Sequence, residues 1–356
     1  MGQVRSVNIK KFQTLVLAWF DQNKRELPWR KHRNWYTVWI SEIMLQQTQV
    51  RQVIPYYLRF MKVFPDLKKL ASARQENVLK IWEGLGFYSR ARNLHKTAKI
   101  ISTQFDGILP QNVRLLSRLP GFGPYTTRAV LSIAYNQPLA VVDGNIMRVI
   151  SRLYAIRLPK TRTKIQNIMD RLIDKQKPGL FNEAMMELGA TICLPANPHC
   201  TRCPLQGYCT AHQTNKVEKY PGKSKSTSKP ILTSLVLLIE HDYKFLLVKR
   251  PQQGLLAGMW EFPTFSNLKF SEVQNLKWRR LLKKWGIHAE LVKKIPAIHH
   301  EYSHFKIRLI PFHVRTGQTA VKLQNYEKYR WTSWNDLNKM PLHRSMYKLM
   351  EKHDPS

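Results

Sequence analysis

The stretch LLSRLPGFGPYTTRAVLSIA, residues 115–134, predicts two helices joined by a tight glycine-rich turn. Gly121 and Gly123 permit backbone conformations and close approaches that other residues resist. Pro124 suits the first turn of the second helix, where its missing N–H costs nothing. The free N–H groups and the positive end of that helix can receive a backbone phosphate. An ordinary turn between two helices is the alternative interpretation of this stretch.

Apolar residues recur at helical spacing on both sides of the hairpin. The segments with this spacing are 12–20, 38–60, 78–85, 93–101, 126–134, 146–153, 165–173 and 181–188. Helix ends are expected at FPD, GLG, LPGFGP and KPG. The sequence therefore predicts a mostly helical domain over residues 1–214.

The composition changes after this domain. Residues 215–230 are rich in lysine and serine and predict an exposed basic linker. Beyond it, ILTSLVLLIE and YKFLLVKR read as two strands of a hairpin separated by HD. A helix is expected over 271–285, and alternating segments follow at 297–314 and 329–334. Residues 231–356 therefore predict a smaller α+β domain, so that the fold class is multidomain.

The chain carries a formal net charge of +35, spread over both halves of its 356 residues. Such a surface attracts polyanions, with an affinity that depends on salt because bound counterions are displaced. DNA, RNA and an anionic membrane remain open on charge alone, as does a basic proteome in which the charge only confers solubility. No apolar run is long enough to span a membrane, and the N-terminus lacks a signal-peptide core. We expect an intracellular (cytoplasmic) protein.

All four cysteines fall in one short segment, with the spacing C-x6-C-x2-C-x5-C: Cys193, Cys200, Cys203 and Cys209. A secreted disulfide framework would spread them between distant elements. The cluster therefore indicates a metal site in a reducing compartment. Structural zinc and an iron–sulfur cluster are both open, although zinc ribbons more often use two C-x2-C knuckles.

Two carboxylates stand in unlike settings. Glu42 lies in VWISEIMLQQTQV among apolar and amide side chains, where burial should raise its pKa. Asp143 precedes a segment, 146–153, with helical spacing, so it is expected to be a helix N-cap and to stay ionised. A protonated and an ionised carboxylate form the pair that glycosidic-bond cleavage requires. A satisfied buried glutamate and a simple cap are the structural alternatives.

Several motifs in order resemble the endonuclease III superfamily of base-excision DNA glycosylases, and within it the MutY-type adenine glycosylases. These motifs are LPWR, WISEIMLQQTQV, GLGFYSRARNLH, LPGFGPYT, VVDGNIMRV, FNEAMMELGA and the cysteine loop, residues 193–209. The resemblance implies a helix-hairpin-helix glycosylase domain with a [4Fe–4S] cluster on the four cysteines. It also implies a monomeric, DNA-associated enzyme acting on double-stranded DNA with A:8-oxoguanine or A:G mispairs.

The resemblance implies the catalytic roles as well. Glu42 is expected to protonate the adenine and to help activate water, and Asp143 to stabilise the sugar cation. Tyr125 takes the position at which the lyase branch has a lysine, and a phenol cannot form a Schiff base. Tyr125 and Asn145 are expected to form hydrogen bonds near the sugar and Asp143. The reaction should therefore be monofunctional hydrolysis.

The remaining contacts follow from the same resemblance. Adenine must leave the base stack to be cleaved. Residues expected to contact DNA are Gly121, Gly123, Gln47, Tyr88 and Leu45, and those expected at the base pocket are Trp29, Arg30 and Glu187. Helix packing is the alternative for Leu45, and ordinary core for Trp29.

GLLAGMWEFP and the α+β pattern resemble a Nudix-like C-terminal domain. The equivalent of the Nudix helix, SEVQNLKWRRLLKKWGI, has lysine and arginine where metal-binding carboxylates should be, so DNA binding is expected instead of pyrophosphate hydrolysis. HHEYSH matches the family's 8-oxoguanine loop. The expected recognition residues are His300, Tyr302, Ser303 and His304, with Tyr302 where a Phe is often found.

Two other functions remain in competition. One is an endonuclease III-like glycosylase/lyase acting on damaged pyrimidines, against which Tyr125 and the extra domain count. The other is a non-catalytic DNA-binding protein with a structural metal.

Overall fold

The computed structural model describes residues 8–157, 162–222, 228–266, 278–302 and 305–353. The chain divides into two compact units. The helical unit comprises residues 1–72 and 93–226, and the sheet unit comprises residues 73–92 and 227–356. The segment 73–92 thus groups with the sheet unit although the helical unit encloses it in the sequence.

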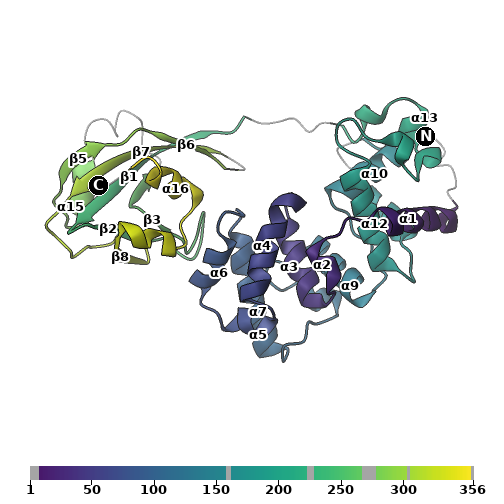
Figure 1. The fold of residues 1–356 in the computed structure, drawn as a ribbon, viewed down its shortest axis with the longest axis horizontal. Helices are drawn as coiled ribbons and strands as arrows, with labels where there is room; N and C mark the ends of the chain where they lie inside the picture. The colour runs from purple at the N-terminus through teal and green to yellow at the C-terminus, as the bar shows by residue number, and fades with distance from the viewer. Residues whose placement is uncertain (1–7, 158–161, 223–227, 267–277, 303–304, 354–356) are drawn as a thin grey trace. The chain divides into compact units, whose positions relative to one another are not determined.

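The described helices run from the purple N-terminus to the yellow C-terminus in Figure 1. They are α1 (Ile9–Asn23), α2 (Pro28–Lys31), α3 (Trp35–Leu45), α4 (Val50–Val63), α5 (Leu67–Ser72), α6 (Gln75–Trp82), α7 (Ser89–Gln104), α8 (Val113–Leu116), α9 (Pro124–Tyr135), α10 (Gly144–Leu153), α11 (Arg162–Leu172), α12 (Pro178–Thr191), α13 (Thr210–Gln213), α15 (Trp278–Lys284) and α16 (Arg344–Met350). Short 3₁₀ turns are η1 (Cys200–Arg202), η2 (Gln206–Tyr208), η3 (Val217–Lys219) and η4 (Trp334–Lys339).

Helix α3 is buried on all sides. Asn34 begins it with a capping box, in which its side chain accepts from the Thr37 N–H and Thr37 Oγ1 accepts from the Asn34 N–H. Every residue from Tyr36 to Met44 is buried. The prediction of one helix over 38–60 was wrong: α3 ends at Leu45, and the backbone at Gln47 turns left-handed, with φ of 55°.

The glycine-rich hairpin is present, with a short first arm, α8. Gly121 has φ of 85°, a conformation that favours glycine, and a Cβ there would lie 3.3 Å from the Asn93 Cβ. Gly123 has φ of −72° as the N-cap of α9, which any residue can adopt, and a Cβ there meets nothing within 4 Å. The conformational argument therefore holds for Gly121, whereas Gly123 leaves open space above the first turn of α9.

One sheet dominates the sheet unit. Its strands are β1 (Ile231–His241), β2 (Lys244–Lys249), β3 (Trp260–Glu261), β4 (Thr264–Ser266), β5 (Glu290–Lys294), β6 (Ile298–Glu301), β7 (Lys306–Arg315) and β8 (Lys328–Ser333). The order is β3-β2-β1-β7-β5, with β4 on β1, β6 on β7 and β8 on β2. β1 runs parallel to β7 and antiparallel to β2, which confirms the predicted hairpin.

Successive side chains of β1 point to opposite faces of the sheet, and each face contributes to its own hydrophobic core. Val236 and Leu238 pack with the residues of η4 and α16 on one face, and Leu235 and Leu237 pack with α15 on the other. A continuous apolar run in β1 is therefore explained by helices covering both faces of the sheet.

Strands β3 and β5 were not predicted from the sequence. All five residues of β5 are exposed and β3 has only two residues, so neither has a burial pattern to detect. The predicted helix 271–285 is present from Trp278 to Lys284, and residues 271–277 lie outside the described part of the chain.

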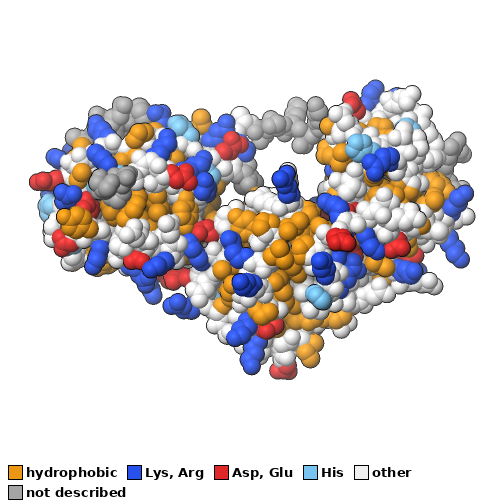
Figure 2. Space-filling view, viewed as in Figure 1, with side chains coloured by type: hydrophobic (Ala, Val, Ile, Leu, Met, Phe, Trp, Pro, Cys, Tyr) orange, Lys and Arg blue, Asp and Glu red, His pale blue; other side chains and the backbone are white. Residues whose placement is uncertain are grey.

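Lysine and arginine side chains are spread over the described surface of both units and are not gathered in one segment (Figure 2). This distribution agrees with the sequence, in which the total net charge of +35 is shared between both halves. In the described part of the chain, no helix combines the length and the apolar character that a membrane crossing needs.

Candidate active site

The helical unit contains a cavity of about 1220 Å³ between α3, α9, α10 and α12. Glu42 of α3 and Asp143 at the start of α10 both line it, although a hundred residues separate them in the sequence. Ligand pockets usually measure roughly 300–1,000 Å³. The cavity is therefore large enough to admit a nucleoside.

Glu42 is 7% exposed, because α3 is enclosed by other helices. Its Oε2 accepts a hydrogen bond of 2.9 Å from the Tyr125 hydroxyl. Burial raises the pKa of Glu42 to about 7; the Tyr125 hydrogen bond lowers it, and the nearby Glu183 and Asp143 charges raise it further. The carboxyl can therefore hold a proton near neutral pH, as the sequence predicted.

Asp143 is the N-cap of α10, which confirms the predicted cap. Its Oδ1 accepts from the Ile146 N–H at 2.7 Å, and its Oδ2 accepts from Asn145 Nδ2 at 2.9 Å. Burial nevertheless raises the pKa of Asp143 above its ordinary value, and the hydrogen bonds from Ile146 and Asn145 offset only part of that rise. The sequence predicted the cap but not this rise in pKa, which comes from burial.

Tyr125 lies in the first turn of α9. Its hydroxyl donates to Glu42 and also contacts Met186 Sδ at 3.3 Å. Burial and the Glu42 carboxylate raise the pKa of Tyr125 well above its usual value, so it remains a donor. Among the described residues that line the cavity there is no lysine.

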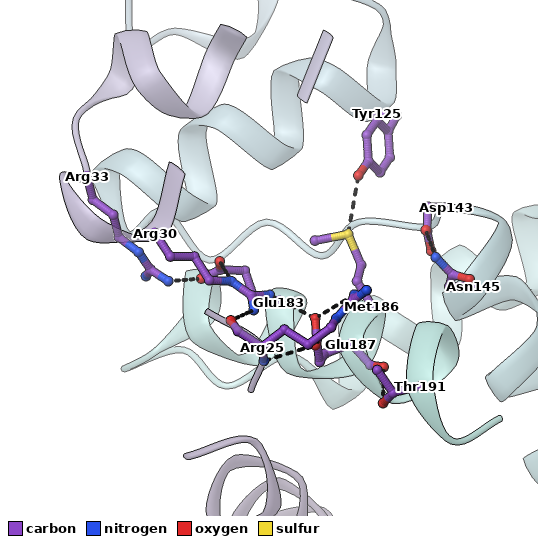
Figure 3. Close-up of polar contacts among 10 residues, drawn as sticks. All are labelled: Arg25, Arg30, Arg33, Tyr125, Asp143, Asn145, Glu183, Met186, Glu187 and Thr191. Carbon is purple, nitrogen blue, oxygen red and sulfur yellow. Dashed lines mark hydrogen bonds and ion pairs between the residues drawn. The ribbon is translucent and has the colours of Figure 1, made fainter. Parts of the chain in front are cut away.

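A network of three arginines and two buried glutamates forms one side of the cavity (Figure 3). Arg30 Nε contacts Glu183 Oε1 at 3.2 Å, and Arg30 Nη2 contacts Glu187 Oε2 at 3.0 Å. Arg33 pairs with Glu183 Oε2 at 2.6 Å, and Arg25 Nη2 donates to Glu187 Oε2 at 3.0 Å. Opposite charges thus compensate one another at two buried carboxylates.

Arg25, Arg33 and Glu183 were missed by the sequence. The signal was available: FNEAMMELGA has two carboxylates four residues apart in an apolar helix, as unusual as Glu42 in α3. Burial alone would raise the pKa of Glu187, but the hydrogen bonds and charges of Arg25 and Arg30 hold it below its usual value. Glu187 is therefore an ionised acceptor, unlike Glu42.

The predicted pocket residues are brought together by the fold. Trp29, Arg30 and Glu187 all line the cavity, and the Trp29 ring meets the edge of Tyr57 at 5.3 Å. Trp29 is 7% exposed, so it is both core and cavity wall.

Four of the five predicted DNA contacts also line the cavity: Leu45, Gln47, Gly121 and Gly123. Gln47 is exposed and its left-handed backbone is unusual for a residue with a side chain. Tyr88 differs, because it is buried in the sheet unit and its hydroxyl accepts from the Gly84 N–H at 3.3 Å. It is not among the residues that line the cavity.

Arg148 connects the Asp143 region to the cysteine loop. Its Nη2 donates to Asn145 Oδ1 at 2.9 Å, and its Nε donates to the carbonyl of Cys193 at 2.7 Å. Asn145 in turn donates to Asp143. Sequence reasoning did not single out Arg148, because one arginine on a basic helix carries no distinguishing pattern.

The four cysteines are half-buried and none forms a disulfide. Burial raises the pKa of Cys203 to about 12, and Arg152 Nη1 lies 3.3 Å from Cys193 Sγ. Across the described ranges, no three His, Cys, Asp or Glu side chains form a group that could hold a single metal ion. The donor set nevertheless fits a metal centre, because the thiols are unpaired and Arg152 can balance the negative charge of bound thiolates.

The predicted 8-oxoguanine residues belong to the sheet unit. His300 lies in β6, which ends at Glu301, so that Tyr302 follows the strand instead of continuing its alternation. Ser303 and His304 lie outside the described residues.

Known proteins were compared with the chain. Residues 40–175 match the HhH-GPD superfamily base excision DNA repair protein family, and residues 235–352 match the NUDIX domain. The adenine DNA glycosylase of Buchnera aphidicola subsp. Acyrthosiphon pisum is 35% identical, over 96% of this chain and 97% of its own. The adenine DNA glycosylase of Mus musculus is 33% identical, over 98% of this chain and 78% of its own.

Two solved structures resemble the helical unit. A thermostable thymine-DNA glycosylase is 27% identical, with a TM-score of 0.53, and covers 58% of this chain and 97% of its own. A trapped endonuclease III–DNA covalent intermediate is 22% identical, with a TM-score of 0.51, and covers 59% of this chain and 99% of its own. The second likeness concerns the fold alone.

Proposed function

The chain belongs to the adenine DNA glycosylases of the HhH-GPD superfamily, and we propose that it hydrolyses the N-glycosidic bond of adenine mispaired with 8-oxoguanine or guanine. It is a DNA N-glycosylase of base-excision repair. The observation that carries the mechanism is that Glu42 and Asp143 line one cavity in the helical unit.

In this mechanism Glu42 donates its proton to the leaving adenine. Its pKa of about 7 suits a general acid that works near neutral pH. Loss of the base leaves positive charge on the sugar, which Asp143 stabilises once it is ionised. The hydrogen bonds from Ile146 and Asn145 hold that carboxylate in place and lower the cost of its charge.

Tyr125 orients Glu42 through the hydrogen bond between its hydroxyl and Oε2. A phenol cannot form a Schiff base with the sugar, and no lysine is present among the described lining residues. We therefore expect water as the final nucleophile and a monofunctional enzyme. This argues against a glycosylase/lyase acting on damaged pyrimidines.

Adenine must be extruded from the duplex to enter the cavity. Trp29, Arg30 and Glu187 are suited to receive the base, since they offer a ring, donors and an ionised acceptor on the same wall. Leu45 and Gln47 are suited to occupy the gap left in the stack. The open first turn of α9 at Gly123 is suited to a backbone phosphate.

The four cysteines are proposed to hold a [4Fe–4S] cluster: Cys193, Cys200, Cys203 and Cys209. When bound, such a cluster ties the four thiolates together and thereby fixes the loop that contains them. Arg152 would donate to Cys193 Sγ and partly balance its charge. A structural zinc is the competing occupant and would be colourless.

The sheet unit is proposed to recognise the base opposite adenine through His300, Tyr302, Ser303 and His304. Hydrolysis of pyrophosphates is not expected from it, because α15 carries Arg279, Arg280, Lys283 and Lys284 where a metal would need carboxylates.

The proposal is tested with duplexes containing A:8-oxoguanine, A:G, A:T and an oxidised pyrimidine, scored for base loss before and after alkali. We expect adenine release from the first two, and strand cleavage only after alkali. Glu42→Gln should abolish release while the variant still binds the duplex. Cleavage at the oxidised pyrimidine without alkali would favour the lyase, and no base loss from any duplex would favour a non-catalytic DNA-binding protein.

A further inference from the structure

Tyr302 is held by three separate hydrogen bonds within the sheet unit. Its N–H donates to the Phe305 carbonyl at 2.8 Å, and its own carbonyl accepts from Lys229 Nζ at 3.1 Å. Its hydroxyl shares a hydrogen bond of 3.2 Å with Ser345 Oγ, at the start of α16. Backbone and side chain are therefore both fixed at this position.

The half-buried ring of Tyr302 packs against two aromatic neighbours. It meets the His300 ring edge-on with centroids 4.6 Å apart, and it lies 4.8 Å from the Phe305 ring. Ser345 is 0% exposed, so the phenol points its polar end into the protein interior. A side chain free to insert into a base stack would instead need an unattached tip.

Ser345 belongs to a buried polar chain. Its Oγ is hydrogen-bonded to His343 Nδ1 at 2.7 Å, and His343 Nε2 to Glu261 Oε2 at 3.0 Å. Glu261 also accepts from Arg250 Nη1 at 2.8 Å. His343 and Glu261 are 4% and 1% exposed, so no substrate can reach this serine–histidine–glutamate series, and it serves to brace the structure.

We propose that Tyr302 is a positioning residue that anchors the described part of the recognition loop, His300 to Tyr302, to the Glu261–His343–Ser345 chain, and thereby sets the preference for 8-oxoguanine over guanine. The inference rests on the proposed function of this loop. The two bases differ only around N7 and C8, so they are discriminated only if the donors and acceptors that read them are held in fixed positions. A Phe at this position lacks the hydroxyl, so the anchor belongs to this chain's own tyrosine.

The test compares Tyr302→Phe, Ser345→Ala and the double variant in the full-length protein. Both single changes remove the Tyr302–Ser345 hydrogen bond, a neutral one whose loss corresponds to about two- to ten-fold in an equilibrium constant, and Ser345→Ala also removes the bond between Ser345 Oγ and His343 Nδ1. We expect the ratio of kcat/KM for A:8-oxoguanine over A:G to fall by that factor in each. The double variant should fall no further than Ser345→Ala alone, because in that variant the Tyr302 hydroxyl has already lost its partner.

Ser234→Ala is the matched control. Ser234 is also 0% exposed in the same unit, and its Oγ is bonded to Ser266 Oγ at 3.3 Å, away from the Tyr302 chain. This variant should leave the ratio unchanged. The single-turnover rate on A:G at saturating enzyme should stay at the wild-type value in Ser234→Ala, and urea denaturation of each variant shows whether any fall in the ratio reflects a general loss of structure.

The outcomes distinguish failure of the proposed opposite-base recognition from failure of the proposed Tyr302 anchor. If the wild-type protein shows no preference for 8-oxoguanine over guanine, the proposed reading of the opposite base fails. If it shows that preference and both Tyr302→Phe and Ser345→Ala retain it in full, the anchor is wrong and Tyr302 acts through its ring alone. Additive losses in the double variant would also overturn the shared hydrogen bond.

Discussion

The side chain of Glu42 shows what a single residue in an apolar helix can reveal. The sequence indicated a raised pKa from its neighbours, and burial raises it to about 7. For Asp143 the sequence predicted the cap but not the rise in pKa, because a cap can be recognised from local sequence but burial by distant helices cannot. The pairing of Glu183 with Arg33 was equally hidden, since it depends on how α12 meets the loop between α2 and α3 in three dimensions.

Replacing Glu42 by Gln should stabilise the fold at high pH. The folded protein keeps this proton up to pH 7, whereas the unfolded chain releases it near pH 4.5, so the free energy of unfolding falls as the pH rises between these values. A shift of this size is worth about 3 kcal/mol. Urea denaturation should show Glu42→Gln more stable than wild type at pH 8 by up to that amount, with the difference reduced at pH 4. An equal difference at both values would contradict the raised pKa.

The pH dependence of adenine release should report the same carboxyl. A general acid must be protonated, so the single-turnover rate should decline on the alkaline side with an apparent pKa of about 7. Glu183→Gln removes a negative charge that raises the pKa of Glu42, and it leaves Arg30 and Arg33 less neutralised. The alkaline limb should therefore move to lower pH. Asp170→Asn, which removes a charge outside the cavity lining, is the control and should leave the limb in place.

At the scale of elements, the helix-hairpin-helix was predictable because Gly121, Gly123 and Pro124 mark its turn in the sequence. The break between α3 and α4 was not predicted, although residues 46–49, QQTQ, contain no apolar side chain; α3 ends at Leu45, α4 begins at Val50, and the backbone at Gln47 between them is left-handed. Strained backbone of this kind at a cavity wall is consistent with a functional position. The exposed edge strand β5 was missed because it has no buried face.

Alanine substitutions at the two glycines of the hairpin should affect different properties, with Gly121→Ala lowering stability and Gly123→Ala weakening DNA binding. Gly121→Ala forces a side chain into φ of 85° and against Asn93, so it should lower the free energy of unfolding by about 1–3 kcal/mol. Gly123→Ala meets nothing within 4 Å and has φ of −72°, so it should leave stability within about 0.5 kcal/mol. Urea denaturation measures both.

Gly123→Ala should nevertheless weaken binding to a duplex, because the new methyl group occupies the open space at the first turn of α9. Fluorescence anisotropy with an A:G duplex measures this. Equal stability and equal affinity would show that no phosphate approaches this turn.

At the scale of the whole molecule, the change from helical period to strand period near residue 230 predicted two kinds of domain, and the cores of both follow those periods. The grouping of residues 73–92 with the sheet unit could not be predicted. It depends on single contacts, such as Tyr347 Oη and the Leu342 N–H donating to Glu83 Oε1 at 2.8 and 2.9 Å, which join residues far apart in the sequence.

The net charge of +35 leads to a prediction about the complete chain. Cations on both units should displace counterions from DNA, so affinity for an undamaged duplex should fall steeply and linearly with the logarithm of salt concentration. Six or more phosphate contacts would lower it by about 10³-fold between 50 and 200 mM salt. The ratio of affinities for A:8-oxoguanine and A:T duplexes should change far less, because base contacts release few counterions. Titrations of a Glu42→Gln protein, which cannot consume the substrate, measure both quantities, and a ratio that collapses with the affinity would mean that recognition of the mispair is electrostatic.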